Sequence, residues 1–506
     1  MRRLALFAPF ELLALLACST PPPTRALPPE AAPALSLAPG QVADVALTAE
    51  GRADVRLATP GGTERFVVIL ASSRLSGGSE PSHYTLSPGN APSASPSALV
   101  TGCALSPERF AGTVVASDPP PSGTPPREGA TRTLHISTRA GNETIQARAL
   151  SVGEHAAIWA DTTHPTSLDA DFVLQFRDDF ERVILPRARQ VFGTEPDLDQ
   201  DGRIQLVFTR LTRDSGVAFF SSCDLAPLDG CQASNHGEYL YLTPPDAIQP
   251  PYNTPNAIKE ILAHEVAHLL HFQRKVLRNH LQTWQDGVYL SEGIGALAQD
   301  VTGFQAGNLY VTRAALDGIE QFSLADVLHG DEPDRARQGV LRGGGYLFVR
   351  YLYDRAGGDR ASGLELENTG GPSLVRALLD SPQWIDQALP SVAGADLTRL
   401  QLDFYTALAL SNREEAGAAR AANPCFQYLP TSVDPVTQKQ RGANLFAHFH
   451  GSQMQGPQLG DARAPDGTLL TGGVEYLSLE ASAPETSFSL QVEPTSMPRL
   501  RIARLR

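Results

Sequence analysis

Asn256-Ala-Ile-Lys-Glu-Ile-Leu-Ala-His-Glu-Val-Ala-His-Leu-Leu-His-Phe-Gln273 is the stretch of sequence that decides the fold. Its apolar side chains recur at steps of three and four residues, which is the spacing of one face of a helix. His264 and His268 stand four positions apart inside this pattern. Because residues four apart are neighbours on a helix surface, their imidazoles can converge on one point. The stretch therefore predicts a helix that presents a pair of histidines.

The residues around these histidines predict a metal site. Two neutral imidazoles that converge in this way suit a zinc ion. Glu265, next to His264, is placed to polarise a water molecule on such an ion. The run His264-Glu-Val-Ala-His268 has the His-Glu-x-x-His pattern of zinc metalloproteases. The alternative interpretation is a buried helix with a paired histidine face and no metal.

A third zinc ligand is expected further along the chain. A catalytic zinc needs three protein ligands and a position left open for water. A second helical pattern, Leu290-Ser-Glu-Gly-Ile-Gly-Ala-Leu-Ala298, has Glu292 near its start, and the polar residues 279–287 can fold it back. We therefore predict that His264, His268 and Glu292 hold the ion. The alternative for Glu292 is an acid that stabilises a helix N-terminus.

Together with Ser291-Glu292-Gly293, the histidine motif resembles the gluzincin group of metallopeptidases. It is most similar to the hyicolysin-type neutral zinc metallopeptidases of bacteria, over residues 150–420 or so. The similarity extends to three further segments: Asp197-Leu-Asp-Gln-Asp-Gly202, Glu238-Tyr-Leu-Tyr-Leu242 and Gly345-Tyr-Leu-Phe-Val-Arg-Tyr-Leu352. The resemblance implies a zincin-like domain of the α+β class that hydrolyses peptide bonds, with Glu265 as the general base.

The first residues predict export. Met1-Arg2-Arg3 is basic, and residues 4–17 are mostly apolar but too short to cross a bilayer, so residues 1–18 are typical of a signal segment. Leu15-Leu-Ala-Cys18 resembles the lipobox of bacterial lipoproteins, in which the cysteine is acylated. An ordinary secretory signal, cleaved nearby, is the alternative. The proline-rich residues 19–34 predict an extended tether.

Four cysteines remain if Cys18 carries lipid, and an even number in an exported chain indicates disulfides. Cys223 and Cys231 bracket a short loop, which favours pairing them and leaves Cys103 for Cys425. Four cysteines allow three pairings, and the sequence alone does not choose among them.

The net charge of −14 argues against nucleic acid or an anionic membrane surface as a partner. The expected partner is a protein or peptide substrate. Contact with a membrane is expected only through the lipid anchor.

The chain of 506 residues is long enough for more than one domain. Residues 35–72 alternate in strand fashion, and loops or linkers rich in proline, serine and glycine follow at 76–97 and 118–129, so residues 35–130 are assigned to a β-rich domain. Residues 131–421 are assigned to the zinc metalloprotease domain and residues 422–506 to a C-terminal β-rich segment. An extended substrate is expected along an edge strand near Tyr239.

Asp197, Asp199 and Asp201, followed by Gly202, copy the first half of a calcium loop. The twelfth position would be Phe208 and not glutamate, which excludes an EF-hand but leaves another kind of Ca²⁺ site. An acidic, solvated turn is the alternative.

Tyr346 is a candidate donor to the oxyanion of a tetrahedral intermediate, with a core position as the alternative.

These patterns together predict an exported, lipid-anchored zinc endopeptidase. The rival hypothesis is a non-catalytic surface lipoprotein, an adhesin or scaffold in which the metal only braces the fold. A structural zinc site would be closed by four protein ligands, whereas a catalytic site keeps one position open.

Overall fold

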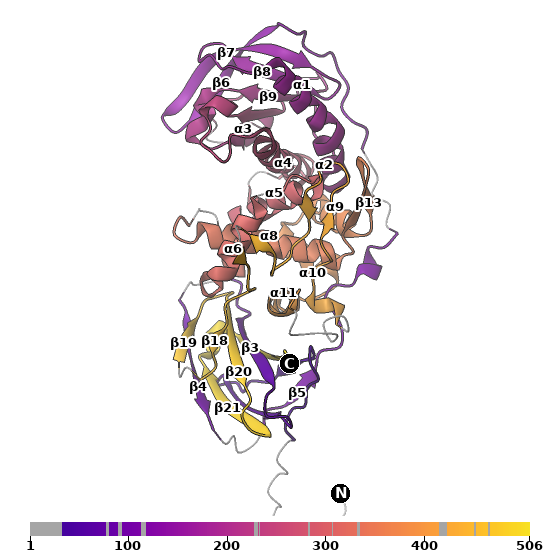
Figure 1. Ribbon diagram of the computed structural model, residues 1–506. Helices are drawn as coiled ribbons and strands as arrows, with labels where there is room; N and C mark the ends of the chain where they lie inside the picture. Colours follow the sequence, from indigo (N-terminus) through magenta and orange to yellow (C-terminus); the bar gives the residue numbers. More distant parts are fainter. Residues whose placement is uncertain are drawn as a thin grey trace, which may run out of the picture.

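The helix that carries the two histidines lies near the middle of the molecule (Figure 1). In the computed structural model, α4 spans Pro255–Phe272 and so confirms the predicted helix. The hydroxyl of Thr254 accepts the backbone N–H of Ala257 and caps the first turn. Pro255 follows at the first helical position, where its missing N–H leaves no donor unpaired.

The structure describes residues 33–506, apart from 77–79, 90–93, 113–117, 227–230, 232, 282–283, 306, 331–333, 414–422, 450–451 and 464–465. Cys18, the predicted signal segment and nearly all of the predicted tether lie outside the described residues. Within those that are described, no helix combines the length and the apolar character needed to cross a membrane.

A six-stranded sheet forms the upper part of the molecule in Figure 1, in the order β10-β11-β9-β8-β7-β6. Three of the four inner strands, β8, β9 and β11, run parallel, and the other neighbours are antiparallel. Ile158 and Leu206 face the helices, while Trp159 and Val207 face a smaller core on the other side. The strands are β6 (Thr131–Thr138), β7 (Gly141–Val152), β8 (Ala156–Asp161), β9 (Ile204–Phe208), β10 (Ala218–Phe220) and β11 (Tyr239–Leu242).

Helices fill the middle of the molecule. α1 (Ala170–Asp179) and α2 (Leu185–Phe192) contact α4, and α5 packs between α4 and α8. The short α3 is Ser222–Leu225. The remaining helices are α5 (Val288–Thr302), α6 (Asn308–Asp317), α7 (Leu324–His329), α8 (Gln338–Arg355), α9 (Gly371–Asp380), α10 (Ile385–Ala393) and α11 (Leu397–Leu410), with the hairpin β12 (Asp359–Ser362) and β13 (Glu365–Asn368) beside them.

Two sheets form the lower part, and each combines strands from both ends of the chain. Their facing side chains form one core. The first sheet has the order β18 (Gly460–Asp461), β20 (Val474–Glu480), β3 (Arg65–Ser72), β22 (Pro498–Arg504), β1 (Val42–Val45), β5 (Ser97–Leu99). The second has the order β19 (Asp466–Leu469), β4 (Ser82–Pro88), β21 (Glu485–Val492), β2 (Arg52–Ala58).

Strand β3 joins this sandwich to the helices. Phe66 and Val68 point into the core between the two sheets, while Val67 and Ile69 belong to the core of the helices. Because neighbouring side chains of a strand point to opposite faces, an unbroken apolar run fits a strand that is buried on both sides.

The mixed α+β class is confirmed, but the β-rich ends are organised differently from the expectation. Residues 35–130 and 422–506 were assigned to separate regions, whereas their strands pair with one another in the two lower sheets. The stretch 76–97, expected as loop, contains β4. Serine, threonine and proline dominate β4, and its partners β19 and β21 lie hundreds of residues away in the sequence, so local composition concealed it.

Both expected disulfides are present. Cys223 and Cys231 close the short loop beside β10. Cys103 and Cys425 join positions 322 residues apart and tie the segment after β5 to the segment after α11.

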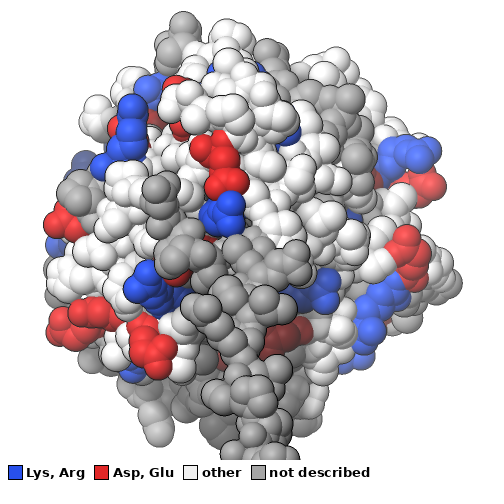
Figure 2. Space-filling view, turned by 90° about the horizontal axis from the view of Figure 1, so that it is seen from below, with Lys and Arg blue, Asp and Glu red and all other residues white. Residues whose placement is uncertain are grey.

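The charges on the lower face are mixed: Figure 2 shows basic and acidic side chains interspersed over the described part of this face.

Candidate metal centre

The structure brings His264, His268 and Glu292 together. The two imidazoles lie one turn apart on α4, with their ring centres separated by 4.7 Å. From α5, Oε2 of Glu292 lies 3.2 Å from Nε2 of His264, and Oε1 lies 3.9 Å from Nε2 of His268. One ligand atom from each residue lies within 4.8 Å of the other two. Among the described residues, no fourth cysteine, histidine or carboxylate joins this group.

Two glycines of α5 allow this close approach. A Cβ atom at Gly295 would lie 2.5 Å from Cε1 of His264, so only glycine leaves room for the imidazole. A Cβ at Gly293 would lie 2.6 Å from the carbonyl oxygen of Gly345 on α8. Glycine inside a helix costs about 1 kcal/mol relative to alanine. The close approach of a histidine and of a neighbouring helix explains why glycine occupies these two positions in spite of that cost.

The electrostatics of the group suit a cation. Burial lowers the pKa of His268 to about 3, and the charge of His264 adds to this effect. Burial acts to raise the pKa of Glu292, but its hydrogen bond from His264 and the nearby positive charges outweigh burial and hold that pKa far below its usual range. Burial acts to lower the pKa of His264, and the contact with Glu292 raises it instead. A neutral imidazole and an ionised carboxylate are the forms that bind zinc.

The donor set therefore fits a zinc ion. Two imidazole nitrogens and one carboxylate oxygen form a known set of catalytic zinc ligands. The hydroxyl of Ser291 lies 3.1 Å from Nδ1 of His268 and can fix the orientation of that ring.

Glu265 connects this group to the upper sheet. Its Oε2 accepts the backbone N–H of Phe220 at 3.0 Å, and the side chain is 9% exposed. Burial raises the pKa of Glu265 to about 7. A carboxyl group whose pKa lies near neutrality can both accept and return a proton.

Phe220 belongs to β10, which forms the end of the sheet. The sequence placed an edge strand near Tyr239, but that residue lies in β11, between β10 and β9. The strand beside Glu265 is β10, which is only three residues long and gave no clear strand pattern in the sequence.

Arg342 is a site residue that the sequence did not reveal. Its Nε donates to Oε2 of Glu292 at 3.0 Å, and Nη2 contacts the same oxygen. Its side chain is 38% exposed, so the guanidinium borders both the ligand group and solvent. Arg342 precedes the run Gly343-Gly344-Gly345, in which Gly345 lets α8 cross α5 closely: a Cβ there would lie 2.4 Å from the carbonyl oxygen of Tyr289. That glycine run is the signal that could have directed attention to it.

Tyr346 does not lie beside the candidate metal ligands. Its side chain is 1% exposed, and its hydroxyl donates to Oδ2 of Asp300 at 3.0 Å. Asp300 lies eight residues beyond Glu292 on α5, a rise of about 12 Å along the helix. This placement removes the hydroxyl from the metal ligands and does not support the expected role in oxyanion stabilisation.

The acidic segment forms a different group from the expected one. Asp197 and Asp199 lie together, but their third partner is Glu238 and not Asp201. Asp201 instead contacts Arg132 at 3.1 Å and accepts from the side-chain amide of Gln205.

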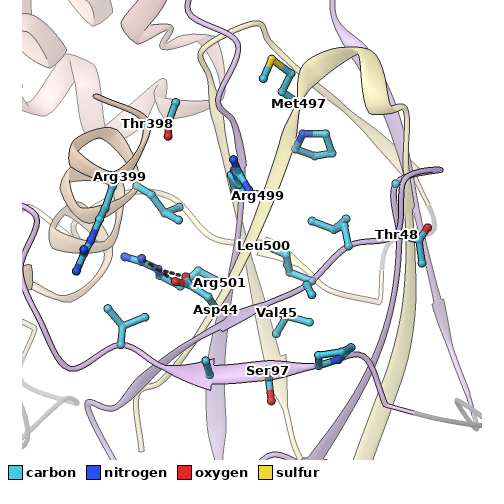
Figure 3. Close-up of a pocket in the computed structure, with 18 of the residues that line it drawn as sticks. Asp44, Val45, Thr48, Ser97, Thr398, Arg399, Met497, Arg499, Leu500 and Arg501 are labelled. Atoms are coloured by element: carbon cyan, nitrogen blue, oxygen red, sulfur yellow. Dashed lines mark hydrogen bonds and ion pairs between the residues drawn. The ribbon is translucent and has the colours of Figure 1, made fainter. Parts of the chain in front are cut away.

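A separate cavity of about 1030 Å³ lies between the lower sheets and α11 (Figure 3). Arg399 and Arg501 line it, and the dashed line in Figure 3 joins Arg501 to Asp44 at 2.7 Å. None of the three metal-ligand candidates lines this cavity.

No model of a known protein family matches the chain, and a search of curated proteins gives no significant match.

Proposed function

We propose that this chain is an exported zinc-dependent endopeptidase of the gluzincin type, similar to the hyicolysin-type enzymes. The observation that carries the proposal is the meeting of His264, His268 and Glu292 with Glu265 beside them. Three ligands leave the coordination position that catalysis requires, which favours an enzyme over a purely structural metal.

His264, His268 and Glu292 would hold the zinc ion. A zinc ion in such a site supplies Lewis acidity toward a water molecule and toward the scissile carbonyl. Glu265 takes the proton from the attacking water and passes it to the leaving amine. The guanidinium of Arg342 is the nearest described cation to the group and donates to the carbonyl oxygen as negative charge develops there.

The open side of β10 is the proposed place for an extended peptide. An edge strand has backbone N–H and C=O groups free to pair with another extended chain. The N–H of Phe220 that reaches Glu265 marks the side of β10 that faces the metal centre. A peptide aligned along β10 would therefore run past both the general base and the ligand group.

Export is part of the proposal. The two disulfides suit an oxidising compartment, because cytosolic proteins seldom retain them. Lipidation at Cys18 would hold the enzyme at a bacterial envelope, and secretion without lipid is the other form of the same proposal.

The decisive experiment replaces Glu265→Gln in the full chain. We expect zinc content and melting temperature to be unchanged, while hydrolysis of casein falls by about 10²–10⁴-fold, the range that general acid–base catalysis contributes. Glu320→Gln, at an exposed carboxylate on the surface, is the matched control and should keep the parental rate.

Casein hydrolysis by Glu265→Gln at the parental rate would contradict the mechanism. A zinc-loaded parent that cleaves neither casein nor a panel of peptides would contradict the enzymatic proposal and favour the metal-braced scaffold.

A further inference from the structure

A second group of carboxylates lies where strands β9 and β11 of the upper sheet begin. Asp197 and Asp199 come from the turn before β9, and Glu238 directly precedes β11. One oxygen from each lies within 4.8 Å of the other two. Three carboxylates at this separation repel one another unless positive charge lies among them.

Glu238 is the unusual member. Its side chain is 1% exposed, and Oε1 accepts the backbone N–H of Leu198 at 2.9 Å. Its second oxygen, Oε2, is buried and has no hydrogen-bond partner. A buried carboxylate oxygen without a partner loses its hydration and gains nothing in return, so such atoms in proteins call for an explanation.

The turn is held in shape around this group. Oδ1 of Asp197 accepts the N–H of Gly202 at 3.0 Å, and Oδ1 of Asp199 accepts the N–H of Asp201 at 3.3 Å. The carbonyl of Gln200 accepts the N–H of Thr124, which anchors the turn against a distant segment. Each aspartate thus uses one oxygen in the turn itself, and Oδ2 of Asp199 accepts from Arg132.

The positive charge near the three carboxylates is smaller than their combined negative charge. Arg132 contacts Oδ2 of Asp199 at 3.3 Å but also pairs with Asp201 and with the hydroxyl of Tyr239. One shared guanidinium does not balance the group.

We propose that Asp197, Asp199 and Glu238 bind a calcium ion. The available donors are all carboxylate oxygens, which suit a hard cation and not zinc. Calcium tolerates irregular geometry and completes its coordination with water. A calcium ion bound here would be the partner that Oε2 of Glu238 otherwise lacks.

The site would join two neighbouring strands. β9 follows the aspartate turn, β11 follows Glu238, and the two strands pair in parallel. β11 also pairs with β10, the strand whose Phe220 contacts Glu265. Calcium would therefore stabilise the sheet that supports the proposed substrate edge without being part of the catalytic group.

The test measures calcium binding by calorimetry and thermal unfolding, using the full-length, zinc-loaded Glu265→Gln protein with CaCl₂ as the probe. Calcium at a hundred times its dissociation constant should raise the melting temperature by about 2–3 °C. In Glu238→Gln, calcium should bind at least about tenfold more weakly, because one charged ligand is lost.

Two variants separate this site from general destabilisation. In the absence of calcium, Glu238→Gln should be as stable as the parent or more so, because the variant removes an unbalanced buried charge. Asp201→Asn, the aspartate outside the group, should retain calcium binding. Absence of binding at millimolar calcium, or equal affinity in Glu238→Gln and the parent, would overturn the proposal whatever the outcome for peptide hydrolysis.

Discussion

The described part of the chain contains two groups of metal-ligand type, and they are built in opposite ways. The first group, His264, His268 and Glu292, is the proposed zinc site; two members come from one turn of α4 and the third from α5, so its spacing is local in the sequence. The acidic group, Asp197, Asp199 and Glu238, takes two members from the turn before β9 and the third from the position directly before β11, about forty residues later. Each has an arginine at one carboxylate: Arg342 at Glu292 and Arg132 at Asp199.

The difference lies in what the surroundings supply. At the proposed zinc site, Glu265 lies beside the candidate ligands and accepts the N–H of Phe220 in the edge strand β10, so the proposed general base and the proposed substrate strand are adjacent to them. At the acidic group, the neighbours are Arg132, Gln205 and backbone amides that shape a turn. The first arrangement is suited to chemistry and the second to holding strands together.

Selective chelation should separate the two groups with the largest effect. Removal of zinc by a zinc-selective chelator should abolish casein hydrolysis, and added zinc should restore it, because the ligand residues cannot act alone. A calcium-selective chelator should lower the melting temperature while leaving the initial rate at low temperature unchanged. Loss of the initial rate with the calcium chelator alone would show that the two groups are not functionally distinct.

Replacement of Arg342→Ala should reduce kcat/KM by about 10²–10³-fold, the loss expected for one oxyanion donor. Zinc content should remain at the parental level, and Arg342→Lys should restore part of the rate. If the variant instead loses zinc while its zinc-loaded form keeps the parental kcat, Arg342 only positions Glu292. Steady-state kinetics on metal-analysed protein distinguishes these outcomes.

Gly295→Ala should weaken zinc binding by about 10–100-fold, because the new Cβ displaces the ring of His264. Gly339→Ala on α8 is the control: its Cβ would lie 3.3 Å from the Cβ of Ala314, well away from the ligands. Competition with a fluorescent zinc indicator measures both affinities. Equal zinc affinities of the two variants would mean that α4 and α5 can move apart at this contact.

The sequence predicted the parts of the molecule that depend on local spacing. The four-residue step between His264 and His268 needs only one helix, and Glu292 needs only a return of the next helix.

Residues that act through a distant helix or strand were missed. Arg342 reaches Glu292 because glycines let α8 cross α5, a contact between residues 50 positions apart. Tyr346 lies one turn further along α8 and pairs with Asp300 instead. Glu238 took the place expected for Asp201, because Arg132 and Gln205 draw that aspartate away.

The lower sheets have a consequence for how the chain matures. Of their five N-terminal strands, only β1 and β5 pair with each other, while β2, β3 and β4 find their partners among β19 to β22. During synthesis these three strands therefore lack their partner strands until the last fifty residues or so emerge. Proteolytic activation that removed residues 42–99 would leave the strands β19 to β22 without these partners. We therefore expect this segment to remain in the mature protein.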